Sequence, residues 1–129
     1  MARVGFRDKE KTFSKCNIEE HFSKNLPQIE QRTLNLVEKI AIFFSLSNDV
    51  SIDIFNCYLA LSRQVKTNRN HLVFLAFSVH YISEKMMDIN PITIPEICHL
   101  FTIFDHRITP RLILKNRLQY ERIVAEKLY

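Results

Sequence analysis

The sequence is poor in turn-forming residues: its 129 residues include one Gly and four Pro. It contains no Asn-Gly or Asp-Gly pair, and these pairs form the tight turns that join the strands of β-hairpins. Leu, Ile, Phe, Lys and Glu recur along the chain instead. The shortage of Gly and Pro therefore excludes a hairpin-rich β protein and predicts an all-α fold.

Pairs of closely spaced cysteines are also missing. Cys16, Cys57 and Cys98 lie far apart, and no CxxC motif or cluster of Cys and His has the spacing of a metal site. This pattern argues against a disulfide framework and against structural zinc, and it is typical of buried thiols in a reducing compartment. We expect neither a metal nor another cofactor.

Long apolar runs are absent too. The N-terminus lacks the apolar segment of a signal peptide, and no run approaches the roughly 18 residues that a membrane span requires. The sequence predicts an intracellular protein of the nucleus or cytoplasm with no membrane partner. Its first 15 residues carry five basic and two acidic side chains, and we expect them to form a flexible basic arm.

Motifs of known catalytic sites are not found. The chain has no glycine-rich phosphate loop, no HExxH, no GxSxG and no paired-acid motif. The five histidines are scattered, and the neighbours Cys98 and His99 would point about 100° apart on a helix, too far apart to pair easily as nucleophile and base. We predict that the protein is not an enzyme.

Apolar spacing predicts five main helices in a single domain over residues 16–129. Ser51 is expected to cap the second helix, and Thr93 and Thr109 precede prolines that favour the first turn of a helix. The third helix is apolar on nearly all sides, which predicts that it is central and buried, with the other helices packed around it. A short helix over 17–25 precedes them. The five main helices are expected over residues 28–44, 51–65, 70–87, 93 to about 103, and from 109 nearly to the C-terminus.

Basic side chains are concentrated in the last predicted helix. The chain carries a net charge of +4 and has a pI near 9.1, and residues 106–127 alone contain six basic and two acidic side chains. Arg111 and Lys115 lie four residues apart on one helical face, and Arg107 and Arg117 can flank them. Such a stripe fits a nucleic-acid phosphate backbone or an acidic protein, although an ordinary solvated helix face has the same pattern.

The run LVFLAFSVHYISEKMMDINPITIPEIC, residues 72–98, has a familiar order. An apolar helix ends in a basic residue, a proline-bearing link follows, and a short helix begins with Thr-Ile-Pro-Glu-Ile-Cys. From 28 to 127 the chain resembles a cyclin box, and this run is similar to one core repeat of transcription factor IIB. The resemblance implies an adaptor in transcription that contacts DNA or polymerase-associated protein. A complete factor IIB has two such repeats and a zinc ribbon, whereas this chain has one repeat and no metal ligands.

Two alternatives stay open. Cyclins pair a Lys at the end of the third helix with a Glu in the fifth to hold a protein kinase, and Lys85 and Glu121 occupy similar places. The Ile-Ser-Glu-Lys that contains Lys85 is one residue longer than the cyclin pattern. The other alternative is a self-associating helical protein with an exposed apolar surface, such as the cluster 42–44, Ile-Phe-Phe.

Overall fold

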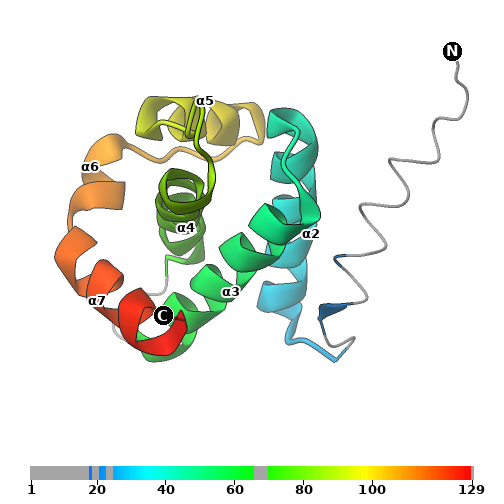
Figure 1. The fold of residues 1–129 in the computed structure, drawn as a ribbon, viewed down its shortest axis with the longest axis vertical. Helices are drawn as coiled ribbons and strands as arrows, with labels where there is room; N and C mark the ends of the chain where they lie inside the picture. The colour runs from blue at the N-terminus through cyan, green and yellow to red at the C-terminus, as the bar shows by residue number, and fades with distance from the viewer. Residues whose placement is uncertain (1–17, 19–20, 23–24, 66–69, 129) are drawn as a thin grey trace, which may run out of the picture. The chain divides into compact units, whose positions relative to one another are not determined.

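The computed structural model describes residues 18, 21–22, 25–65 and 70–128 (Figure 1). These residues form six α-helices and no strand, so the predicted all-α class is confirmed. The chain divides into two compact units, residues 1–52 and 53–129, and each is described by itself. The predicted arm and most of the short helix over 17–25 lie outside the described residues. The single domain over 16–129 stays a prediction.

The first unit contains α2 (Gln28–Phe44) and the first residues of α3 (Asn48–Gln64). The bounds of α2 are those expected from its apolar spacing. It ends at Ser45, where a φ of 56° turns the backbone into the left-handed region, and the N–H of Leu46 donates to the carbonyl of Ala41 (2.8 Å). One side of α2 is buried, and it consists of Thr33, Leu34, Val37, Glu38, Ile40 and Ala41.

The start of α3 corrects the expected cap. Ser51 lies inside the helix, where its hydroxyl donates to the carbonyl of Ser47 (2.9 Å). The capping side chain is Ser47, whose Oγ accepts from the backbone N–H of Val50 (3.3 Å). The helix therefore begins three residues before the predicted position, because Ser47 already satisfies a free N–H of the first turn.

The second unit contains the rest of α3 together with α4 (His71–Met86), α5 (Ile94–Ile103), α6 (Pro110–Leu114) and α7 (Arg117–Leu128). Figure 1 shows α4 nearly end-on, with these other helices arranged on its sides. Seven consecutive residues of α4, 73–79, are buried. None of the described helices of the chain is both long and apolar enough to cross a membrane.

Aromatic side chains hold α7 and α3 to α4. The ring of Tyr120 on α7 packs edge-on against Phe74 and Phe77 of α4, with centroid distances of 5.7 and 5.3 Å. The hydroxyl of buried Tyr58 on α3 shares a 2.8 Å hydrogen bond with Nδ1 of His71 at the start of α4. These contacts bury large apolar surfaces and satisfy the phenol at the same time.

Hydrogen bonds of one buried serine, Ser83, stabilise the link from α4 to α5. The backbone N–H of Ile92 donates to Oγ of Ser83 (3.0 Å), and that hydroxyl donates to the carbonyl of His80 (2.9 Å). Nδ1 of His80 in turn donates to the carbonyl of Ile92 (2.9 Å). The start of α5 then has the expected capping box, in which Thr93 and Glu96 bond reciprocally.

The predicted fifth helix is two helices, and this corrects the expected count of five. Thr109 caps α6 and Pro110 is its first residue, as predicted, but α6 ends at Leu114. The chain bends at Lys115 and Asn116, and α7 begins at Arg117. The bend lets buried Ile113 on α6 and buried Tyr120 on α7 both reach the core of this unit, although the chain curves between them (Figure 1).

Candidate nucleic-acid interface

Arg107 is presented by the link between α5 and α6. At Asp105 the backbone has a φ of 65°, and the N–H of His106 then donates to the carbonyl of Phe101 (2.8 Å). These features end α5 and turn the chain outward. Ile108 is buried, while Arg107 and Thr109 on either side of it are exposed. Alternation in an extended segment thus anchors the link and leaves Arg107 in solvent.

Arg111 and Lys115 extend this basic surface along α6. Both are exposed, and the backbone at Lys115 is still helical, with φ −53° and ψ −42°. Residues four apart on such a backbone share a face, as the sequence predicted. None of the three cations Arg107, Arg111 and Lys115 forms an ion pair with another described residue. Their charges are therefore available to a binding partner.

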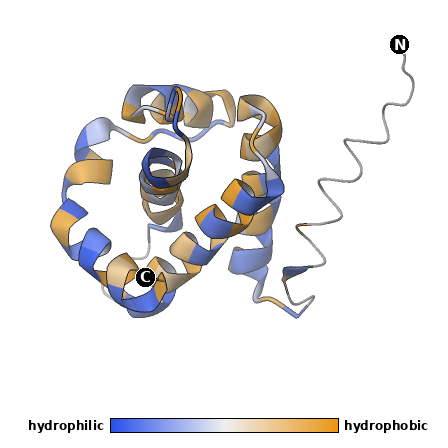
Figure 2. Cartoon of the chain, viewed as in Figure 1, coloured by the Kyte–Doolittle hydropathy of each residue, from blue (hydrophilic) through white to orange (hydrophobic). Residues whose placement is uncertain are grey.

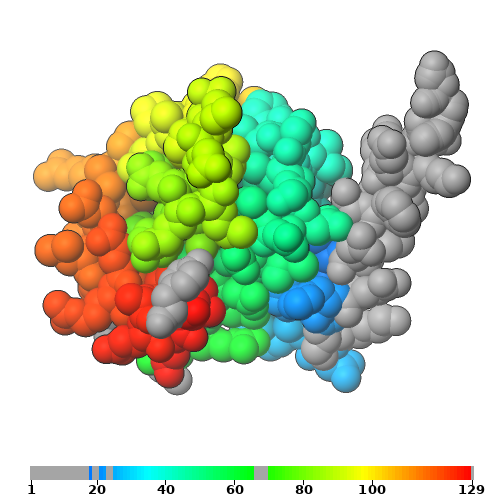
Figure 3. Space-filling view, in the orientation of Figure 1, coloured from blue at the N-terminus to red at the C-terminus, as the bar shows by residue number. Residues whose placement is uncertain are grey.

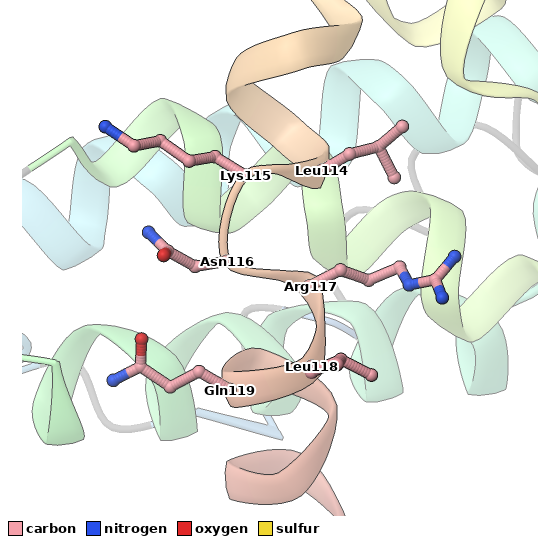
Figure 4. A pocket seen from close by; sticks show the side chains of 6 residues that line it. All are labelled: Leu114, Lys115, Asn116, Arg117, Leu118 and Gln119. Carbon is pink, nitrogen blue, oxygen red and sulfur yellow. The ribbon is translucent and has the colours of Figure 1, made fainter.

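Arg117 differs from the other three predicted cations. Its Nε lies 3.7 Å from Oε2 of Glu121, one turn further along α7. Figure 4 shows Lys115, Asn116 and Gln119 extending to one side of the bend, while Leu114, Arg117 and Leu118 extend to the other. The structure therefore brings Arg111 and Lys115 together on one face, and it places Arg117 on another.

The bend itself lines an open hollow of about 490 Å³. Its walls combine two leucines with four polar side chains, from Leu114 to Gln119 (Figure 4). The hollow offers no enclosed apolar volume for a small ligand, because one continuous stretch of chain lines it.

Exposed leucines also lie on α6 and α7. Leu112, Leu114 and Leu118 are all exposed, and Leu118 has 70% of its surface in solvent. In Figure 2 hydrophobic and hydrophilic segments alternate along α6 and α7. Leu114 and Leu118 extend to the same side of the bend (Figure 4), so these two apolar side chains are exposed together.

The two residues of the cyclin-like alternative make contacts within their own helices. The Nζ of Lys85 lies 5.1 Å from the ring centroid of Tyr81 on α4, a cation–π contact. Glu121 is the partner of Arg117 on α7. The kinase-binding role of Lys85 and Glu121 stays a prediction.

Two cysteines and two histidines of the described residues are engaged in packing or hydrogen bonding. Burial raises the pKa of the Cys57 thiol to about 12 and also raises the pKa of Cys98. A high pKa keeps a thiol protonated and unreactive at neutral pH. His71 and His80 are bonded to Tyr58 and to the Ile92 carbonyl, as described above. No group of three potential metal ligands lies together among the described residues.

The feature that sequence reasoning missed is the break at Lys115 and Asn116. A signal was present: Asn is a poor residue within a helix and a favoured one at its start. The carbonyl of Asn116 accepts the first intrahelical bond of α7, from the N–H of Tyr120 (3.0 Å). Because the break was not foreseen, Arg117 was grouped with Lys115 although the two extend to opposite sides (Figure 4).

No family model, curated protein or solved structure matches this chain.

Proposed function

We propose that the protein is a non-enzymatic adaptor in transcription that binds the phosphate backbone of DNA through Arg107, Arg111 and Lys115. The observation that carries the proposal is the exposure of these three unpaired cations on consecutive elements of one unit. Phosphate contacts of this kind supply most of the affinity of sequence-independent DNA binding. Arg117 contributes less, because Glu121 already neutralises part of its charge.

The proposal includes a cyclin-box-like arrangement similar to one core repeat of transcription factor IIB. Three features support it. Nine of the sixteen residues of α4 are buried, and Ser-Glu-Lys lies in its last turn; a link containing Pro91 follows; and Thr93 caps the short α5. The order of helices from α2 onward is the one that the resemblance implies, with the fifth helix bent into α6 and α7.

Salt dependence tests the DNA contact. Binding of the purified chain to a fluorescent DNA duplex is measured at 50 and 200 mM salt. Three phosphate contacts predict a slope of about −2.7 in the logarithm of the binding constant against that of salt, or about 40-fold weaker binding over this range. The double variant R111E/K115E should bind at least about tenfold more weakly at the lower salt concentration and show a shallower slope.

A charge-matched control separates this surface from net charge. Arg32 and Lys39 are exposed residues of α2, so R32E/K39E changes the charge of the chain by the same amount at another place. We expect R32E/K39E to weaken binding by much less than R111E/K115E. Equal losses in the two variants, or no binding of the wild type at 50 mM salt, would overturn the proposal.

A further inference from the structure

The side of α7 that faces away from the core carries a regular pattern. On α7, Leu118, Glu121 and Ala125 follow one another at intervals of three and four residues, which is the spacing of a helix-pairing seam. Leu114, the last residue of α6, extends to the same side of the bend as Leu118 (Figure 4). The core side of α7 is occupied by Tyr120 and Val124, which are buried. We call Leu114, Leu118, Glu121 and Ala125, together with Arg117, the outer seam. None of its members is buried.

Leu118 is the apolar centre of the outer seam. It has 70% of its surface in solvent, and Leu114 at the end of α6 has 42%. In Figure 4 both leucines and Arg117 extend to the same side of the bend, and in Figure 3 the side chains of α6 and α7 stand along the surface without another described helix over them. The seam is thus a helix face that the described part of the chain leaves uncovered.

We propose that the outer seam binds the outer seam of a second copy of this chain, with the two α7 helices antiparallel around a twofold axis. The charges of the seam are self-complementary: antiparallel helices that cross level with Gln119 place Arg117 of each copy beside Glu121 of the other. The same register places the two Leu118 side chains together near the axis.

Charge balance favours a second copy over other occupants. Arg117 and Glu121 cancel, so the seam attracts neither a strongly acidic protein nor a phosphate backbone. The unpaired Lys115 extends to the opposite side of the bend (Figure 4). The seam can therefore be covered while Lys115 stays accessible, and self-association does not require DNA.

Sedimentation equilibrium of the full chain without DNA tests the pairing. We expect a reversible dimer below about 1 mM, and L118D should weaken it at least about tenfold, because the twofold axis places two aspartates together. The matched control is I89D, since Ile89 in the α4–α5 link has 77% of its surface in solvent and lies outside the seam. A monomer at every concentration, or equal effects of L118D and I89D, would overturn the proposal.

Charge reversal tests the register. R117E and E121R each place like charges across the twofold axis, and each should weaken the dimer about fivefold. The double variant R117E/E121R restores opposite charges and should recover the wild-type dissociation constant. Failure of the double variant to recover it excludes this register. Circular dichroism of each variant checks that the exposed substitutions leave the helices intact.

Discussion

Two helical regions of the second unit, α4 and the bent pair α6–α7, differ in how they use apolar residues. In α4 nine of the sixteen residues are buried, and they include the two serines Ser78 and Ser83. In α7 two of twelve are buried. Large apolar residues nevertheless stand in solvent on α6 and α7, at Leu112, Leu114 and Leu118.

The difference shows that these regions have separate tasks. Tyr120 is one point where they meet, since its ring packs on Phe74 and Phe77 of α4. Tyr120 thus packs one side of α7 against the core, and the other faces of this helix are exposed and can contact partners. Substitutions in α4 should therefore change folding, whereas substitutions on the outer faces of α6 and α7 should change binding.

The sharpest test of this division is Phe74→Ala. Phe74 is fully buried against Tyr120, and removing its ring should lower the free energy of unfolding by about 3–5 kcal/mol through lost burial and a residual cavity. Urea unfolding monitored by circular dichroism measures the change. Leu118→Ala, which removes a large side chain from the exposed face of α7, should change stability by less than about 0.5 kcal/mol in dilute protein.

If F74A and L118A lowered the free energy of unfolding by similar amounts, the division between a core helix and an exposed helix face would be wrong. Such a result would mean that the exposed face of α7 contributes to the core. Repeating the unfolding measurements at several protein concentrations makes L118A a stricter control. If the outer seam pairs two copies, the effect of L118A on unfolding should grow as the protein concentration rises, while that of F74A should not.

A smaller effect is expected at the serine that fastens the α4–α5 link. Ser83→Ala removes the acceptor of the Ile92 N–H and should cost about 1–3 kcal/mol. Ser78→Ala is a matched control on the same helix, because the Ser78 hydroxyl donates to Phe74 of its own helix (2.7 Å). Hydrogen exchange gives a local measurement: the amide of Ile92 should lose protection in S83A and keep it in S78A.

The helix boundaries could be predicted from the sequence at positions where only one local signal was present. The bounds of α2, the cap at Thr93 with its proline and Glu96, and the position of Thr109 all follow from local chemistry, and all were confirmed. The start of α3 was misplaced because Ser47 and Ser51 both qualify as caps. Sequence alone gives no reason to prefer one, since the choice depends on where the chain leaves α2.

The surface was predictable in part. The four-residue spacing of Arg111 and Lys115 is compatible with a shared face, because the backbone at Lys115, just after α6, is still helical. The place of Arg117 could not be read from spacing, because a single break at Asn116 changes the direction of every later side chain. Tertiary packing of Ile113 and Tyr120 selects that break, and local propensity only permits it.

The smallest losses of stability are expected when the helix caps of α5 and α6 are removed. The two caps consist of different groups. Thr93→Ala and Thr109→Ala each remove a side-chain acceptor from a helix start and should each cost about 1 kcal/mol. At α5 the capping box adds Glu96, whose carboxylate accepts from the backbone N–H of Thr93 (2.8 Å) and from its hydroxyl. At α6 the corresponding residue is Leu112, which has no ionisable group.

The two caps therefore differ in their response to pH. Hydrogen bonds from Thr93 lower the pKa of Glu96 below its ordinary value of 4.5. A carboxyl with a lowered pKa in the folded state stabilises fully above 4.5, and this contribution is lost as the pH falls through the folded-state pKa. The difference in unfolding free energy between wild type and E96Q should thus be constant above pH 4.5 and shrink below it. The difference between wild type and T109A should not change over the same range, and a parallel decline in both would show that Glu96 is not its source.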